Sequence, residues 1–183
     1  MSPQKIKVRF PPSPTGFLHI GSLRTALYNY LFARKMGGIF LLRIEDTDRA
    51  RTVEGGVDNI KSTLAWCGLN WDEGPYVQSE RLPIYKEHAG ELLRNGNAYI
   101  CTCSSERLAK VRQIQIEHKE APKYDGHCRI KGPKVLKVPD IADVPYAYVI
   151  RLKVPEDGAT VFTDLVHGKM SFENKLIDDQ VLM

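Results

Sequence analysis

The sequence of 183 residues predicts an α/β fold that opens with a parallel sheet and continues into a second part of different organisation. Apolar residues alternate over 6–10, which indicates a half-buried strand, and apolar residues at helical spacing follow over 23–31. After Gly37-Gly38, residues 39–44 are typical of a largely buried strand. A strand, a helix and a second strand in this order predict a parallel pair with a right-handed crossover. The residues expected on one face of the helix are Leu23, Leu27, Tyr30 and Leu31.

Two more helices are expected before residue 100. Thr52 can cap a helix that ends at Gly68, since a hydroxyl side chain favours a helix start and glycine favours the position after a helix end. The other helix is predicted over 84–95 and is terminated by Gly96.

The pattern changes beyond about residue 100. Ser104 is expected to cap a polar helix running to about residue 120, and a loop rich in proline and glycine then reaches Pro139. Strands are predicted over 146–154, 160–165 and 169–172. Because no helix separates these strands, they favour an antiparallel patch, and we expect two parts, residues 1–100 and 101–183.

The composition narrows the class of protein. A hydrophobic fraction of 43% supports a real core, and no apolar run approaches the roughly 20 residues that span a bilayer. The amino terminus has no signal-peptide pattern, and only four cysteines are present, so we expect a reducing, cytoplasmic compartment. The net charge is +4 with no polybasic tract, so nucleic-acid binding would depend on local placement of Lys and Arg.

The connection between the first strand and the first helix is the most informative segment. It reads Arg-Phe-Pro-Pro-Ser-Pro-Thr-Gly-Phe-Leu-His-Ile-Gly-Ser-Leu-Arg over residues 9–24, and its three prolines and two glycines predict a rigid, sharply turned loop. His19, Gly21 and Ser22 therefore fall at a helix start, where backbone N–H groups are unpaired and the helix dipole is positive. Such a helix start suits a phosphate group.

Residues 19–22, His-Ile-Gly-Ser, resemble the first signature of class I aminoacyl-tRNA synthetases, with Ser22 departing from its fourth position. More narrowly, residues 9–21 and the segment Arg-Ile-Glu-Asp-Thr-Asp-Arg over 43–49 resemble the glutamyl-tRNA synthetase branch. The resemblance implies a Rossmann-like catalytic domain interrupted by an insertion that grips the tRNA acceptor end. Residues 1–100 would be the first half of that domain and 101–183 the insertion, with the chain truncated where the second half should follow.

The resemblance also implies roles for single residues. Glutamate activation needs positioning and stabilisation of negative charge on phosphate oxygens rather than a protein nucleophile. Arg9 at the strand edge would pair with the substrate's side-chain carboxylate, for which its planar fork is suited, while Ser13 and Glu45 would bind the amino-acid end. A solvated arginine and a surface acid are the structural alternatives for Arg9 and Glu45. The residues implied in the ATP site are Pro12, Thr15, Gly16, His19 and Gly21, with Ser22 beside them.

Asp48, Arg49 and Arg51 lie in or just after the same segment. By resemblance they would lie close to bound tRNA, where an arginine could contact phosphate. Local salt bridges between them are the alternative.

A second cluster of candidate residues is Cys101-x-Cys103, followed 24 residues later by Cys128. Three thiolates with a fourth ligand would satisfy tetrahedral zinc, and Tyr124 and His127 both lie near Cys128. Histidine is the better generic ligand, whereas relatives of the family are known with a Cys-x-Cys…Tyr-x-x-x-Cys pattern. Three reduced cysteines without metal are the alternative. Any zinc would organise the insertion rather than take part in the chemistry.

Residues 168–171, Gly-Lys-Met-Ser, imitate part of the second class I signature, whose lysine stabilises the transition state. That loop belongs later in the family's sequences, and Lys169 here continues into a predicted strand. We therefore predict a structural role for this stretch.

Together these features predict a glutamate–tRNA ligase that forms glutamyl-adenylate from L-glutamate and ATP with Mg²⁺ and passes the glutamyl group to the 3′ end of tRNA(Glu). A monomer with no membrane association is expected, and little activity is expected from the 183 residues alone. The rival predictions are an enzyme that attaches glutamate to queuosine in tRNA(Asp), the glutamine-specific synthetase, and a fragment that binds ATP, glutamate or RNA without turnover.

Overall fold

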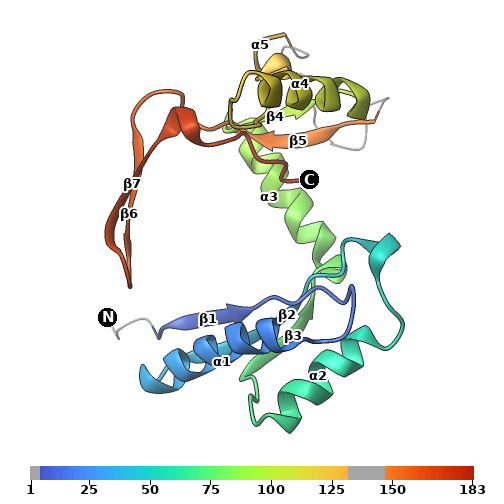
Figure 1. The fold of residues 1–183 in the computed structure, drawn as a ribbon, viewed down its shortest axis with the longest axis vertical. Helices are drawn as coiled ribbons and strands as arrows, with labels where there is room; N and C mark the ends of the chain where they lie inside the picture. Colours follow the sequence, from blue (N-terminus) through green and yellow to red (C-terminus); the bar gives the residue numbers. More distant parts are fainter. Residues whose placement is uncertain (1–4, 132–146) are drawn as a thin grey trace. The chain divides into compact units, whose positions relative to one another are not determined.

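The computed structural model describes residues 5–131 and 147–183. Residues 132–139 of the loop expected up to Pro139, and the first residue of the strand expected over 146–154, lie outside the described residues, whereas the described part of that loop contains a short helix over 127–131 that was not predicted. The chain divides into two compact units, Met1–Leu82 and Pro83–Met183 (Figure 1). Within the described ranges, no helix is long and apolar enough to cross a membrane.

The first unit contains a three-stranded parallel sheet in the order β1-β2-β3. The strands are β1 (Lys7–Phe10), β2 (Ile39–Ile44) and β3 (Glu73–Val77). The predicted parallel pairing of the first two strands is confirmed, with Arg9 opposite Leu41. The third strand was not expected, because Gly74 and Pro75 interrupt its pattern. Gly74 has a φ of +96°, and a Cβ there would lie 2.3 Å from the carbonyl oxygen of Leu42, so the irregular pairing of β3 requires glycine.

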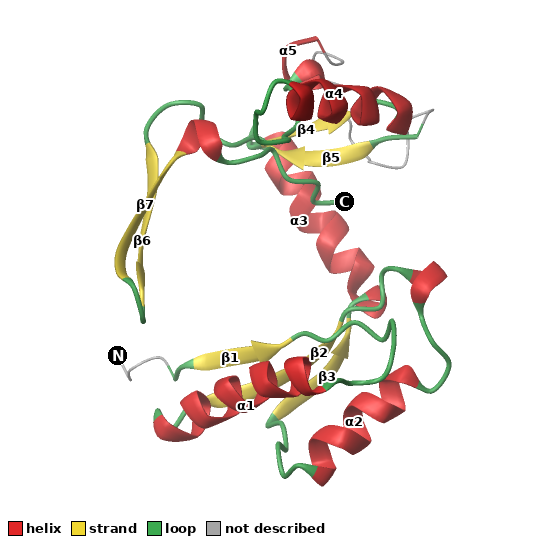
Figure 2. Cartoon of the chain, in the orientation of Figure 1, coloured by secondary structure: helices red, strands yellow, loops and turns green. Residues whose placement is uncertain are grey.

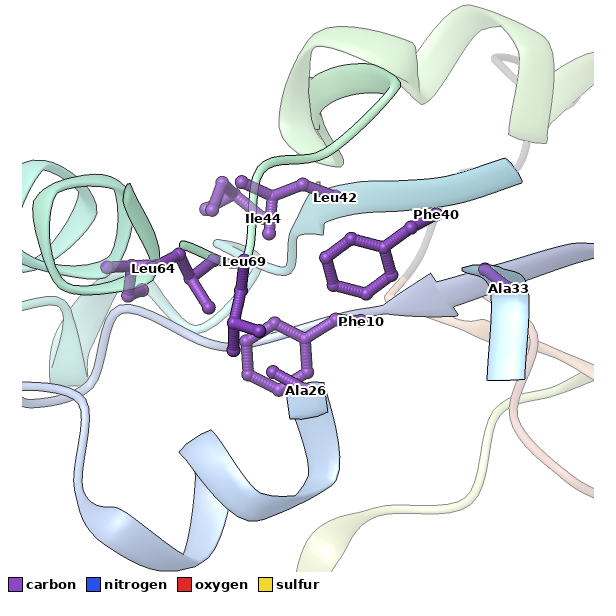
Figure 3. Close-up of a cluster of buried hydrophobic side chains, with 9 residues drawn as sticks. Phe10, Ala26, Ala33, Phe40, Leu42, Ile44, Leu64 and Leu69 are labelled. Carbon is purple, nitrogen blue, oxygen red and sulfur yellow. The ribbon is translucent and has the colours of Figure 1, made fainter. Parts of the chain in front are cut away.

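Two helices, α1 (Ile20–Lys35) and α2 (Gly56–Trp66), pack against one face of this sheet. Every second residue of β2 enters the core, which Figure 3 shows. The buried core residues are Phe10, Ala26, Ala33, Phe40, Leu42, Ile44, Ile60, Leu64 and Leu69.

The buried face of α1 differs from the face expected from the sequence. Leu27 and Leu31 are 42% and 53% exposed, whereas Ala26 and Ala33 are fully buried and Leu23 and Tyr30 pack beside them. The small alanine side chains allow the helix to approach the sheet closely, so the face that the sheet covers is not the most apolar face.

Thr52 does not cap α2, contrary to the prediction. The helix begins after Gly55, which adopts a φ of +73° and makes no side-chain cap. Thr52 instead closes the short 3₁₀ helix η1 (Arg49–Arg51), and its Oγ1 donates a hydrogen bond of 3.1 Å to the carbonyl of Asp48. Gly68 follows the end of α2 with a φ of +71°, as predicted.

The second unit contains two small antiparallel sheets (Figure 2). The strands expected over 160–165 and 169–172 pair with each other as predicted, but the strand expected over 146–154 pairs with residues 98–101, where no strand was predicted. One sheet pairs β4 (Ala98–Cys101) with β5 (Val149–Leu152), and the other pairs β6 (Ala159–Asp164) with β7 (Gly168–Glu173). Lys169 lies in β7 opposite Thr163, so its predicted place in a strand is also confirmed. The helices of this unit are α3 (Leu82–Arg94), α4 (Ser105–Glu117) and α5 (His127–Lys131), with the 3₁₀ turn η4 (Asn174–Leu176). The 3₁₀ turn η2 (Ser79–Arg81) ends the first unit.

The division between the units falls earlier than residue 100. Ala89 of α3 is buried together with Ala98 of β4 and Ile150 of β5, so this helix belongs to the core of the second unit. Ser104 accepts a hydrogen bond of 3.3 Å from the Arg107 N–H and caps α4, as predicted.

Candidate functional site

The loop between β1 and α1 is fixed to the rest of the first unit at three points. The carbonyl of Pro12 accepts a hydrogen bond from the Glu45 N–H, and that of Pro14 accepts one from the Val53 N–H, each at 2.9 Å. Further along, the Leu18 N–H donates to Oδ1 of Asn59 on α2, also at 2.9 Å. Three separate segments of the first unit therefore hold the loop in place.

This loop borders a cavity of about 480 Å³. Most residues expected around ATP or the amino acid do line it, with Gly21, Arg9 and Glu45 as the exceptions. The lining residues are Phe10, Pro11, Pro12, Ser13, Thr15, Gly16, Phe17, Leu18, His19, Ser22, Thr25 and Ile60. The structure therefore brings the proline-rich loop and the start of α1 together around one hollow.

His19 caps the amino-terminal end of α1 with its ring. Its Nδ1 accepts a hydrogen bond of 3.1 Å from the Gly21 N–H, and its Nε2 lies 3.1 Å from Oγ of Ser22. Because Nδ1 is an acceptor, the neutral ring carries its proton on Nε2, which donates toward Ser22. The first turn of α1 contains no acidic residue, so the positive end of the helix dipole is not neutralised there.

A side chain at residue 21 would crowd this ring. A Cβ at residue 21 would lie 3.0 Å from Cε1 and 3.1 Å from Nδ1 of His19. Glycine therefore allows the imidazole to fold back over the helix start.

Arg9 and Glu45 lie at the carboxyl ends of β1 and β2, the edge where ligands bind in open α/β sheets. The Arg9 side chain is exposed, on the face of the sheet away from the helices. Glu45 is an ion-pair partner of Arg43 in β2, a contact that the sequence motif did not reveal. Both residues are thus next to the loop, but their side chains do not line the cavity.

The segment after Glu45 forms local interactions. Asp48 accepts a hydrogen bond of 2.6 Å from Nε of Arg51, and it also accepts one from the Arg51 backbone N–H. The local salt bridge considered from the sequence is therefore present for this pair, while Arg49 is exposed in η1.

Asn59 was not among the residues expected to matter. It lies 41 residues from the loop that it anchors, on the second helix, and no motif includes it. Its position one residue before the buried Ile60 is the only sequence signal that it lies near the core.

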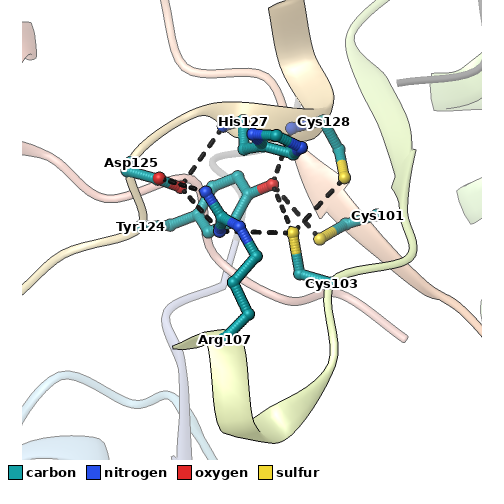
Figure 4. A network of polar contacts seen from close by, with 7 residues as sticks. All are labelled: Cys101, Cys103, Arg107, Tyr124, Asp125, His127 and Cys128. Atoms are coloured by element: carbon teal, nitrogen blue, oxygen red, sulfur yellow. Dashed lines mark hydrogen bonds and ion pairs between the residues drawn. The ribbon is translucent and has the colours of Figure 1, made fainter. Parts of the chain in front are cut away.

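The three cysteines of the second unit come together, with their sulfur atoms within 4.8 Å of one another. Cys101 ends β4, Cys103 follows it, and Cys128 lies in α5. The hydroxyl of Tyr124 lies among them, 3.3 Å from Sγ of Cys101 and 3.4 Å from Sγ of Cys103 (Figure 4). His127 is not part of this cluster of close ligand atoms. Of the two candidate fourth ligands, Tyr124 is thus the one whose ligand atom faces the sulfurs.

The acidity of the thiols differs within the cluster. Burial raises the pKa of Cys103 to about 11. Burial acts in the same direction on Cys128, but hydrogen bonds, first from the Tyr124 hydroxyl and then from the Thr102 backbone, outweigh it and lower its pKa to about 7. Cys128 is therefore more ready than Cys103 to become a thiolate ligand.

The spacing of these atoms fits a tetrahedral zinc ion. Sulfur at about 2.3 Å and oxygen at about 2.0 Å from zinc give sulfur–sulfur edges of about 3.8 Å and sulfur–oxygen edges of about 3.5 Å. The sulfurs of Cys103 and Cys128 are 3.5 Å apart, and the two sulfur–oxygen distances at Tyr124 are 3.3 and 3.4 Å. These three distances would each have to lengthen by only about 0.1 to 0.3 Å to match the edges of a zinc tetrahedron.

Comparison with known proteins identifies the family. Residues 5–183 match the family model described as tRNA synthetases class I (E and Q), catalytic domain. The chain belongs to this family. It is 50% identical to the glutamate–tRNA ligase of Clostridioides difficile and 50% identical to that of Treponema denticola, over 97% and 98% of its own length.

Solved structures agree with this class I synthetase assignment. A glutamate–tRNA ligase from Elizabethkingia meningosepticum, crystallised with its amino acid, is 37% identical with a TM-score of 0.81, and 97% of this chain is covered. The enzyme from Elizabethkingia anophelis gives a TM-score of 0.82. The chain spans 39% and 37% of the two curated relatives and 38% and 39% of the two structures.

Proposed function

We propose that this chain is the ATP- and glutamate-binding part of a glutamate–tRNA ligase, which makes glutamyl-adenylate and transfers the glutamyl group to the 3′ end of tRNA(Glu). The observation that carries the proposal is the cavity at the start of α1, where the proline-rich loop, His19 and Ser22 meet. The high identity to glutamate–tRNA ligases supports the choice of amino acid.

In the proposed mechanism, the start of α1 binds the triphosphate of ATP. The free N–H groups of the first turn face negative charge that grows on the phosphate oxygens during attack by the glutamate carboxylate, and the Nε2–H of His19 would exchange the Ser22 hydroxyl for a phosphate oxygen. Mg²⁺ bound to ATP would offset the remaining charge. Gly21 allows the nucleotide to approach the backbone closely because no Cβ intervenes.

Arg9 and Glu45 would select the amino acid. The exposed guanidinium of Arg9 suits the side-chain carboxylate of glutamate, and the carboxylate of Glu45 suits its α-ammonium group. Ser13 on the cavity wall would hydrogen-bond the amino-acid end. Exposed Arg49, in the adjoining turn, is proposed to contact tRNA phosphate, with the Asp48–Arg51 pair holding that turn in shape.

The three cysteines and Tyr124 are proposed to hold a structural zinc ion. A closed set of four ligands leaves no open position for chemistry, so the metal would stabilise the fold of the second unit. Zinc per chain, measured by plasma emission spectrometry after purification without chelator, is expected to be one. Metal-free protein with four titratable thiols would contradict this assignment.

The activity test is glutamate-dependent exchange of pyrophosphate into ATP, measured with the protein as its gene encodes it. Replacing Arg9 with Ala is expected to raise the KM for glutamate by about 10- to 150-fold, the loss of a charged hydrogen bond, with little change in the KM for ATP. Lys7→Ala is the matched control, because Lys7 is a cation on the same face of β1 that pairs with Glu73 instead. Equal losses for both substrates, or equal losses in both variants, would contradict the role of Arg9.

Charging of an unmodified tRNA transcript separates the two tRNA reactions. A transcript contains no queuosine, so glutamate can be attached only at its 3′ end. Attachment to the tRNA(Glu) transcript is expected, whereas attachment only to queuosine-containing tRNA(Asp) would favour the rival enzyme. The monomeric state and the cytoplasmic location stay predictions.

A further inference from the structure

Arg151 lies against the cysteine cluster and was not singled out by any motif. It belongs to β5, only 5% of its surface is exposed, and its guanidinium lies 4.0 Å from the centre of the Tyr124 ring. Its Nη1 donates a hydrogen bond of 2.8 Å to the carbonyl of Asp179. The Arg151 side chain therefore contacts the Tyr124 ring, which faces the sulfurs, and also binds the backbone of Asp179.

The Nε–H of Arg151 is buried and has no hydrogen-bond acceptor in the described part of the chain. Buried donors of this kind are rare, and a buried charge is retained when opposite charge lies nearby. A guanidinium is not deprotonated in proteins. The guanidinium thus keeps its positive charge beside the cluster.

A bound zinc ion would leave this corner negatively charged. Three thiolates and one Zn²⁺ sum to a charge of about −1 when Tyr124 binds as a neutral phenol. Arg107 contacts Sγ of Cys103 at 3.5 Å, but its own charge is matched by Asp125. Arg151 is a cation next to Cys101 and Tyr124, and it can offset the negative charge that remains on the zinc–thiolate group.

We propose that Arg151 is a positioning residue of the metal site: it holds the Tyr124 ring beside the three sulfurs and offsets the negative charge of the zinc–thiolate group. The proposal rests on the proposed zinc site and adds a residue 23 positions beyond Cys128 to it. Its role is to orient and stabilise the ligands, because its own side chain offers donors only and cannot bind zinc.

The test measures the zinc affinity of the chain by competition with a chromophoric chelator. Arg151→Met removes the charge and keeps an apolar stem, and it is expected to weaken zinc binding about 10- to 100-fold. Arg151→Lys keeps a positive charge and is expected to lose less zinc affinity than Arg151→Met. Arg94→Met, the same change at an exposed residue that ends α3, is the matched control and is expected to bind zinc as the unchanged chain does.

Cobalt(II) provides a readout that a general loss of stability would not change. In Arg151→Met, the thiolate-to-cobalt absorption should persist while the ligand-field bands shift, because Tyr124 loses its fixed orientation. If that variant does not fold, the ¹⁵N signal of the Arg151 Nε in the unchanged chain is followed instead, and it is expected to shift when zinc is added.

The outcomes separate this inference from the proposed zinc site. If the unchanged chain binds no zinc, both are overturned. If it binds zinc and Arg151→Met binds zinc equally well with an unchanged cobalt spectrum, only the role of Arg151 is overturned. If the Met and Lys variants lose the same amount of zinc affinity, the charge offset is overturned. If the Arg151 Nε signal does not shift when zinc is added, the contact between Arg151 and the metal site is overturned.

Discussion

Replacing Asn59 with Ala tests whether the loop before His19 depends on a distant anchor. The change removes the acceptor of the Leu18 N–H, which is bonded to Oδ1 of Asn59 at 2.9 Å in a partly buried position. Leaving such a donor unpaired costs about 1–3 kcal/mol, which corresponds to about a 5- to 150-fold change in an equilibrium constant. We expect the loop to open more often by this factor, and the KM for ATP to rise with it.

Amide hydrogen exchange measures this opening at the Leu18 N–H itself, because exchange of a bonded amide reports local opening. Asn59→Asp keeps the acceptor oxygen and should retain protection. Ser62→Ala is the control on α2, since Ser62 is exposed and its Oγ donates to the carbonyl of Asn59 rather than to the loop. Unchanged Leu18 exchange in Asn59→Ala would refute the anchoring argument.

Three further substitutions are predicted. Gly21→Ala places a Cβ 3.0 Å from Cε1 of His19, and the displaced ring should raise the KM for ATP about tenfold or more in the exchange assay, without altered circular dichroism. Lys169→Ala should change the exchange rate less than about twofold, because this exposed residue lies in β7; a loss of orders of magnitude would assign it to the chemistry. Asp46→Asn should destabilise the first unit by about 1 kcal/mol, since the Asp46 carboxylate accepts from both N–H and Oγ of Ser79. Burial would raise the pKa of Asp46, but these hydrogen bonds lower it below 3.8. The difference in free energy of unfolding between the variant and the unchanged protein should therefore be full above about pH 4 and vanish on further acidification. Urea unfolding at several pH values measures this difference, and a value that does not change with pH would contradict the prediction.

The first strand, the first helix and the second strand were predictable because their signals are local. The pattern over 39–44 matches β2 residue for residue, since all its side chains except that of Arg43 are apolar and every second one enters the core. The buried face of α1 was not predictable from hydrophobicity alone. Its contact with the sheet uses Ala26 and Ala33, and the preference for small residues depends on how closely the two elements approach.

Strand β3 and the start of α2 were missed for a different reason. Both depend on glycines with positive φ, Gly74 at +96° and Gly55 at +73°, whose backbone freedom replaces the usual pattern and the usual cap. The conformation of a glycine is set by its surroundings, such as the carbonyl of Leu42 that approaches Gly74. Sequence spacing alone therefore gives little information at these positions.

The three cysteines of the candidate metal cluster could be predicted from the sequence, but the fourth ligand could not. Both Tyr124 and His127 lie close to Cys128 in the sequence, and only the turn into α5 decides which side chain reaches the sulfurs. The Tyr124 hydroxyl accepts the Cys128 N–H at 2.8 Å, so the helix start itself holds the oxygen in place. A histidine ring outside the cluster cannot take that position without rebuilding this turn.

The two candidate sites share one principle of construction. In each, a short motif supplies the groups that face the ligand, and a residue from a distant element holds the motif in shape: Asn59 for the loop before His19 and Arg151 for the ring of Tyr124. Because neither residue needs to touch the ligand, a substitution there should change affinity through geometry and leave the ligand groups themselves intact. Comparing Asn59→Ala and Arg151→Met with substitutions of His19 and Tyr124 therefore separates the cost of losing a contact from the cost of losing its orientation.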